Sequence, residues 1–130
     1  MTTAPTAPLL LYVEDDILIQ DMLVSALEEA GFQLLVADNG TQALDVLAAQ
    51  ADRLDGIITD INLGDGPEGW HVARKARELL NMLPIVYVSA ASDHEWFSKG
   101  VPNSIMIAKP FVPAQVVVAI SSLLTVSGQG

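Results

Sequence analysis

Short apolar runs alternate along the chain with longer segments in which apolar residues recur every three or four positions. The runs are rich in Leu, Ile and Val, as buried strands are, and they cover residues 9–13, 32–37, 56–59, 84–89 and 105–108. The other segments have the spacing of amphipathic helices, and they cover residues 19–30, 43–47, 70–81, 93–99 and 113–125. This alternation predicts an α/β fold, a doubly wound five-stranded parallel sheet with right-handed crossovers.

The helical period also predicts which side of a helix is buried. For the segment 70–81 the predicted inward residues are Val72, Ala73, Ala76, Leu79 and Leu80. The charged residues of the same segment are Arg74, Lys75, Arg77 and Glu78. We expect these four to form a solvated helix face, since three basic residues are too few for a nucleic-acid surface.

Length and composition indicate a single folded unit. A chain of 130 residues has the usual size of one domain, and its 51% of hydrophobic residues exclude disorder for most of it. The domain is expected at residues 8–125. The tail at residues 1–7, rich in Thr, Ala and Pro, and the segment 126–130 are expected to be disordered.

Charge and cysteine content exclude several classes of function. The net charge of −10 argues against nucleic-acid binding, which requires a basic surface. The absence of Cys removes disulfides and thiolate metal sites and fits a reducing compartment. The apolar run before residue 13 is too short to span a membrane and lacks a basic flank. We therefore expect a cytoplasmic protein without a nucleic-acid or membrane partner.

Polar residues follow four of the predicted strands. Glu14 and Asp15 follow the first strand, Asp60 the third, Ser89 the fourth and Lys109 the fifth. The carboxyl ends of parallel strands share one edge of a sheet, and ligands bind at that edge in open α/β sheets. Three carboxylates, a hydroxyl and an ammonium group are therefore expected to converge.

This set of side chains suits phosphoryl transfer. Three neighbouring carboxylates repel one another unless a cation lies between them, and oxygen ligands favour Mg²⁺ or Mn²⁺. Catalysis of phosphoryl transfer consists mostly of positioning and of neutralising phosphoryl oxygens. Lys109 and Ser89 can each bind one oxygen, and Asp60 is predicted to be the nucleophile that becomes an aspartyl-phosphate.

The chain resembles bacterial response-regulator receiver domains, of the CheY-like superfamily, over about residues 8–125. The resemblance rests on the motifs at residues 11–16 (LYVEDD), 57–62 (IITDIN), 88–90 (VSA) and 109–111 (KPF). It implies a flavodoxin-like sheet with strand order 2-1-3-4-5 and a phosphohistidine donor on a sensor histidine kinase or a histidine phosphotransfer protein. It also implies that Asp15 is the main acidic metal ligand, that Glu14 acts largely through water and that the backbone carbonyl of Asn62 is a further ligand.

Two features depart from the pattern of this family. Gly64 occupies a position where receivers often have Pro, and Gly69 lies one residue later than usual, which indicates a longer loop. Met106 stands three residues before the lysine, where the family usually has an aromatic residue. A switch based on that aromatic side chain is therefore not expected in its usual form, although the adaptable Met could move.

The favoured function is a phosphoacceptor module of two-component signal transduction or a phosphorelay, which is not an enzyme beyond its own phosphorylation and dephosphorylation. An aspartate-nucleophile phosphatase or phosphotransferase on the same fold is an alternative. Such enzymes usually have an Asp-x-Asp motif and a cap, whereas this chain has Asp60-Ile61-Asn62. A module that binds without phosphorylation is a second alternative. The chain could be a stand-alone regulator or a receiver from a hybrid kinase.

The last predicted helix lacks charged residues. Its predicted inward residues are Val116, Val117, Ile120, Leu123 and Leu124. Its predicted outward residues are Gln115, Val118, Ala119, Ser122 and Thr125. An uncharged outer face is easily desolvated, so a face containing Val118 and Met106 is expected to bind an output partner or a second copy.

Overall fold

The computed structural model describes residues 7–90, 96 and 99–127. Its sheet consists of β1 (Leu9–Val13), β2 (Gln33–Ala37), β3 (Gly56–Asp60), β4 (Ile85–Ser89) and β5 (Ser104–Ala108). All neighbouring strands are parallel, and their order is β2-β1-β3-β4-β5. Both the predicted strands and the strand order implied by the family resemblance are confirmed.

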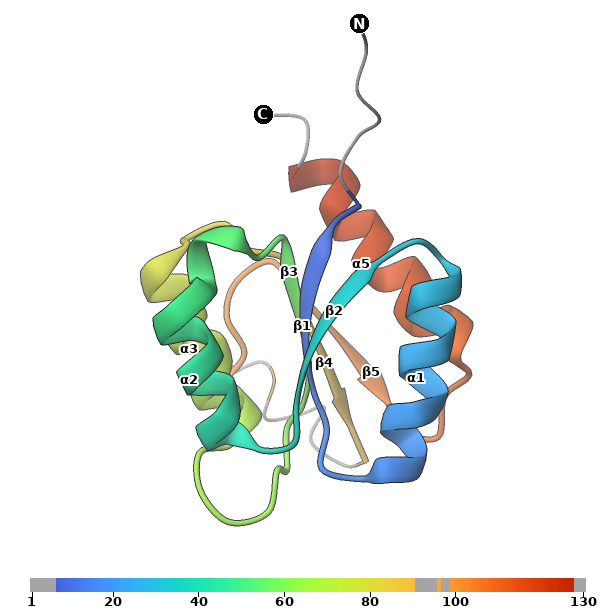
Figure 1. Ribbon diagram of the computed structural model, residues 1–130, viewed down its shortest axis with the longest axis horizontal. Helices are drawn as coiled ribbons and strands as arrows, with labels where there is room; N and C mark the ends of the chain where they lie inside the picture. The colour runs from blue at the N-terminus through green and yellow to red at the C-terminus, as the bar shows by residue number, and fades with distance from the viewer. Residues whose placement is uncertain (1–6, 91–95, 97–98, 128–130) are drawn as a thin grey trace, which may run out of the picture.

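Helices cover both faces of the sheet. They are α1 (Ile17–Glu29), α2 (Gly40–Gln50), α3 (Gly69–Leu79) and α5 (Pro113–Ser127), with a short 3₁₀ turn η1 (Ala51–Arg53) after α2. α1 and α5 lie on one face, and α2 and α3 lie on the other (Figure 1). The predicted helix over residues 93–99 and the predicted tail over residues 1–7 lie largely outside the described residues.

The side chains of the strands divide into two buried layers. Leu11, Ile57 and Tyr87 point toward α2 and α3, whereas Tyr12 and Ile58, on alternate positions, point toward α1 and α5. This follows from the two-residue period of a strand. Because both faces are covered, even the central strands are apolar throughout, as the continuous Leu and Ile runs predicted.

Local signals explain where the helices begin and end. Oδ1 of Asp16 accepts hydrogen bonds from the amides of Leu18 at 2.9 Å and Ile19 at 3.3 Å and so caps α1. The side chain of Asn39 caps α2 in the same way. Gly31, with a φ of 99°, follows the end of α1 in the left-handed conformation that glycine adopts without strain.

Two predictions for α3 are wrong. Leu79 was expected inside, but 45% of it is exposed at the end of the helix. Arg77 was expected on the solvated face, but its guanidinium donates to the carbonyl oxygens of Leu83, Pro102 and Asn103. Arg77 thereby binds α3 to the loops at the start of β4 and β5, which the helical period alone could not indicate.

Two expectations for the last helix are also corrected. Ala119 is buried against the layer that contains Ile107 and is not an outward residue, and α5 extends two residues beyond Thr125. Val118 is 63% exposed, as predicted. Met106, however, packs against the α2–α3 layer, whereas its neighbours on β5 pack against the α1–α5 layer. Met106 and Val118 therefore lie on opposite sides of β5.

Candidate functional site

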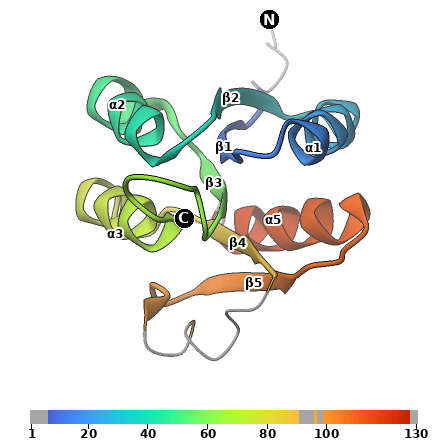
Figure 2. The same cartoon turned by 90° about the horizontal axis from the view of Figure 1, so that it is seen from below.

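Polar residues of four strands meet at one edge of the sheet. Glu14 directly follows β1, Asp60 ends β3, Ser89 ends β4 and Lys109 directly follows β5. Because the strands are parallel, these carboxyl ends share the lower edge of the sheet in Figure 1, which Figure 2 shows from below. The predicted convergence of these residues is therefore observed.

The ammonium group of Lys109 is bound to the carboxylate of Asp60. Its Nζ lies 2.8 Å from Oδ2 of Asp60 and 3.9 Å from Oε1 of Glu14. Burial acts to lower the pKa of Lys109, but its hydrogen bond and charge interaction with Asp60, followed by the charge of Glu14, raise it above the ordinary value. Lys109 is thus held in its charged form beside the carboxylates.

Glu14 is a buried acid, with only 1% of the residue exposed. Burial, followed by repulsion from Asp60, raises the pKa of Glu14 to about 8. Its Oε2 accepts a hydrogen bond from the amide of Asp16 at 3.2 Å, whereas its Oε1 is buried without a hydrogen-bond partner in the described part of the chain. Oε1 of Glu14 can therefore accept a hydrogen bond or bind a cation in addition to the contacts that it makes within the described chain.

Asp60 is nearly buried and is oriented through both carboxylate oxygens. The amide of Asn62 donates to its Oδ1 at 3.2 Å, while Lys109 binds its Oδ2. Ser89 on the neighbouring strand is fully buried, and its carbonyl accepts the amide of Lys109 at 2.8 Å. This backbone bond fixes the start of the chain beyond β5 close to Asp60.

Gly69 is a residue of the site that the sequence analysis treated only as a loop position. Its amide donates to the carbonyl of Ile61 at 2.9 Å, and a Cβ atom there would overlap the carbonyl oxygen of Asp60. Only glycine allows the start of α3 to approach the end of β3 so closely. The signal in the sequence was the glycine itself, but the close contact becomes visible only in three dimensions.

Gln20 is a second residue that the sequence analysis missed. Its Nε2 donates to the carbonyl of Glu14 and to Oδ1 of Asp38, both at 3.0 Å. The first turns of α1 are thereby linked to the ends of β1 and β2. A polar residue on a helix has no sequence signal that would indicate these two acceptors.

The residues at this edge fit a divalent cation. Glu14, Asp15 and Asp60 each bring one carboxylate oxygen within 4.8 Å of the others. Oε1 of Glu14 lacks a hydrogen-bond partner among the described residues, and this group of acids contains no nitrogen or sulfur donor. Both features suit a hard ion such as Mg²⁺ or Mn²⁺. Lys109 binds Asp60 at 2.8 Å and lies 3.9 Å from Oε1 of Glu14, so one ammonium group faces this group of three acids.

Comparison with known families and proteins agrees with this geometry. The sequence pattern of the family described as the response regulator receiver domain matches residues 10–121. A crystal structure of a response regulator receiver protein from Sinorhizobium medicae has a TM-score of 0.88 and 40% sequence identity, covering 92% of this chain and 95% of that one.

Two further relatives show the range of similar proteins. The structure of the chemotaxis response regulator CheY4 of Vibrio cholerae has a TM-score of 0.79 and 25% identity, covering 91% of this chain and 99% of that one. The transcriptional regulatory protein PrrA of Mycobacterium tuberculosis is 32% identical over 126 residues, which cover 95% of this chain and 53% of that protein. The chain thus spans about half the length of the curated relatives it matches.

Within the part of the chain that the structure describes, no helix combines the length and the apolar character that a membrane crossing requires.

Proposed function

Because the chain belongs to the family of response regulator receiver domains, a signalling family of two-component systems, we propose that Asp60 accepts a phosphoryl group from phosphohistidine. The donor would be a sensor histidine kinase or a histidine phosphotransfer protein. The observation that carries the proposal is the contact of 2.8 Å between Lys109 and Asp60 beside the buried Glu14. A carboxylate, a fixed cation and further acids at one strand edge are the parts that phosphoryl transfer needs.

In the proposed step, a carboxylate oxygen of Asp60 attacks the phosphorus of the donor. An O–P bond forms while the N–P bond to the imidazole breaks, and the electron pair of that bond stays on the nitrogen, which takes up a proton from solvent. Lys109, already bound to Asp60, offers its charge to one phosphoryl oxygen. The hydroxyl of Ser89, at the end of the adjacent strand, is proposed to bind another.

Glu14, Asp15 and Asp60 would hold Mg²⁺ or Mn²⁺, with the backbone carbonyl of Asn62 as a further ligand. When bound, the ion supplies positive charge to the phosphoryl oxygens. Support comes from the carboxylate cluster and from Oε1 of Glu14, which has no hydrogen-bond partner among the described residues. In this proposal the main role of Lys109 and Ser89 is to bind phosphoryl oxygens and so to transmit the phosphorylation of Asp60. Binding of the ion depends less on them.

Exposed apolar residues beside this edge offer a surface for the donor. Ile17 and Leu18 in the first turn of α1 are 57% and 81% exposed. Met22, Pro110 and Phe111 line a depression together with Lys109. A donor must bring its phosphohistidine to Asp60, so an apolar surface around the site is suited to protein docking.

We further propose that phosphorylation alters binding at an output surface on α5. Val118 is exposed, and with Ile105, Ile107 and Gln115 it lines a depression of about 500 Å³ without charged residues. An output partner or a second copy would bind there. The name of the mycobacterial relative, a transcriptional regulatory protein, makes regulation of transcription one candidate output.

The test uses acetyl phosphate or a phosphohistidine donor with Mg²⁺ and measures phosphorylation by intact mass. We expect the native protein to become phosphorylated and Asp60→Asn not to. The control is Asp65→Asn, which changes an exposed acid in the loop after β3 and should be phosphorylated like the native protein. A phosphoryl adduct that persists in a folded Asp60→Asn protein would refute the assignment. Rapid turnover of excess acetyl phosphate would instead favour a phosphatase.

A further inference from the structure

A groove of about 600 Å³ lies between α2 and α3. These two helices cover the face of the sheet opposite α1 and α5 (Figure 1). Its lining includes Leu44 and Ala48 of α2, Pro67 of the loop after β3, and His71, Arg74 and Lys75 of α3. The volume falls in the range of about 300 to 1,000 Å³ that is typical of small-molecule sites. The site proposed for phosphorylation does not include any of these residues.

The groove combines an apolar floor with a charged rim, in which two cations outnumber one carboxylate, that of Glu78. Leu44 and Pro67 are half-buried apolar residues, whereas the lining residues of α3, which are His71, Arg74, Lys75 and Glu78, are exposed. On that rim Lys75 forms an ion pair of 3.7 Å with Glu78, but no ion pair of Arg74 is present among the described residues. Arg74 therefore has a guanidinium fork free for a carboxylate.

The two cations of this rim stand out on an acidic chain. The protein has a net charge of −10 and only 6 Lys and Arg residues. Among the others, Lys109 is bound to Asp60, Arg77 to backbone carbonyls and Arg53 to the side chain of Gln50. In the described chain, Arg74 and Lys75 are the adjacent pair of cations that borders an apolar depression.

The loop after β3 forms one end of this groove. Gly66 and Pro67 belong to its lining, and Gly40 lies against Pro67 so closely that a Cβ there would overlap the carbonyl of Pro67. Figure 2 shows this loop passing from β3 across to α2 and α3. The loop between β3 and α3 thus contributes to the lining of the groove between two helices.

We propose that the groove between α2 and α3 binds a small organic carboxylate with an apolar body, whose head group pairs with Arg74 and whose body lies against Leu44, Ala48 and Pro67. A protein partner fits less well, because protein interfaces usually involve about 20 to 30 residues a side. Binding of the carboxylate does not depend on phosphorylation of Asp60. The test of this groove can therefore fail without contradicting the proposed function, and the reverse also holds.

The experiment titrates decanoate into the ¹⁵N-labelled full chain and follows the backbone amide signals. Signals of Gly66, His71 and Arg74 are expected to shift, with a dissociation constant of about 1 mM or tighter. Decanol, which has the same apolar body without the charge, is expected to bind about tenfold more weakly. Binding to Asp60→Asn should be unchanged.

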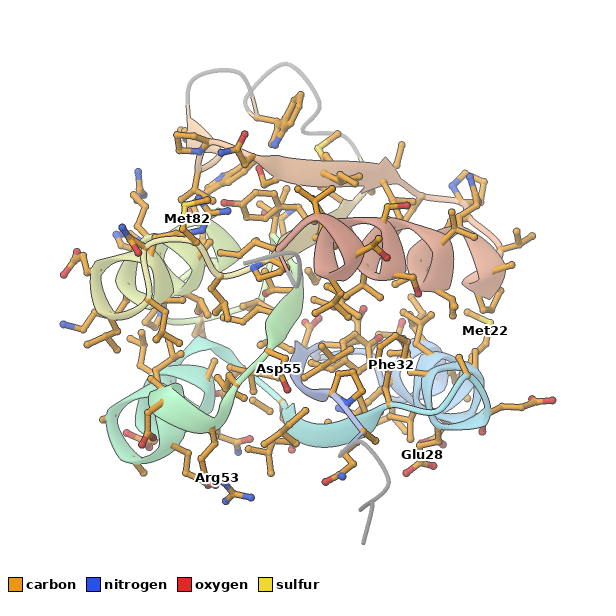
Figure 3. The ribbon with its side chains drawn as sticks, turned by 90° about the horizontal axis from the view of Figure 1, so that it is seen from above. Met22, Glu28, Phe32, Arg53, Asp55 and Met82 are labelled. Carbon is orange, nitrogen blue, oxygen red and sulfur yellow. The ribbon has the colours of Figure 1, made fainter. Side chains whose placement is uncertain are left out.

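Matched variants separate this groove from other surfaces. Ala48→Glu and Arg74→Gln are expected to weaken decanoate binding by about tenfold, since one adds a repelling carboxylate and the other removes the cation. The controls are Ala49→Glu, an exposed neighbour outside the groove lining, and Arg53→Gln, in the η1 turn after α2 and also outside the lining (Figure 3). Both controls should bind decanoate within about twofold of the native protein.

Three results would overturn the proposal. The first is equal binding of decanol and decanoate, and the second is a set of shifts located at the depression beside Val118. The third is self-association of the native protein in sedimentation that Ala48→Glu abolishes, because the groove would then bind a second copy.

Discussion

Nζ of Lys109 lies 2.8 Å from Oδ2 of Asp60, although the two residues are 49 positions apart in the sequence. The contact joins the ends of β3 and β5, which are separated in the sheet by β4. It compensates the charge of an acid that is only 5% exposed. Any change at either residue therefore alters both the stability and the chemistry of this edge.

Lys109→Ala should lower the free energy of unfolding by about 1 to 3 kcal/mol at neutral pH, because Asp60 and Glu14 lose their only cationic contact within the described chain. Urea unfolding without divalent ions would measure the loss. Mg²⁺ binding should remain, whereas phosphorylation should no longer alter partner binding. A Lys109→Ala protein that responds normally to phosphorylation would contradict the proposed role of this residue.

Stability without divalent ions should fall as the pH rises from about 5 to 8. The pKa of Glu14 is raised from 4.5 to about 8 in the folded protein, so the folded state holds this proton more tightly than the unfolded state does. The stabilisation is complete below pH 4.5 and is lost as the pH passes through 8. Urea unfolding from pH 4 to 9 should show a steeper decline in the native protein than in Glu14→Gln. Equal slopes would mean that Glu14 is not the group responsible.

Asp15→Asn should abolish most of the stabilisation that Mg²⁺ gives the native protein. A ligand that binds only the folded state raises the midpoint of thermal unfolding by an amount that grows with the logarithm of its concentration divided by its dissociation constant. Asp15 is one of three acids in the carboxylate cluster. A loss of at least about tenfold in Mg²⁺ affinity is expected. Asp21→Asn, at an exposed acid of α1 outside the cluster, serves as the control. Unchanged Mg²⁺ binding in Asp15→Asn would argue against this metal site.

Gly69→Ala should destabilise the protein by about 1 to 3 kcal/mol and slow phosphorylation of Asp60, because the added Cβ displaces the carbonyl of Asp60. Glu68→Ala changes the preceding residue, which is exposed and makes no side-chain cap bond, and should have little effect. Thermal unfolding and the rate of labelling by acetyl phosphate would measure the two quantities. If Gly69→Ala unfolds at the native temperature and is labelled at the native rate, the close approach of α3 to the end of β3 is not required for either property.

Val118→Glu should abolish association through the output surface without changing phosphorylation or folding, since it adds a charge to an uncharged depression. Val36→Glu is the matched control, because Val36 is 40% exposed on β2, at the opposite edge of the sheet from β5. Sedimentation with and without phosphodonor would report self-association or partner binding. If Val118→Glu leaves self-association and partner binding unchanged, α5 has only a structural role.

The sequence by itself determined the order of the elements and the residues that meet at the site. Strands that are apolar throughout must be covered on both faces, and parallel strands bring their carboxyl ends to one edge. These two constraints are local or topological, so the sequence is enough to predict that Glu14, Asp60, Ser89 and Lys109 lie together.

Tertiary structure alone decided which groups each side chain contacts. Arg77 binds carbonyls as far as 26 residues away, and Ala119 is buried because the layer containing Ile107 covers it. The helical period specifies the faces of a helix but not what packs against them. For the same reason the separation of Met106 from Val118 across β5, and the groove beside Arg74, depend on how the helices and loops pack around the sheet.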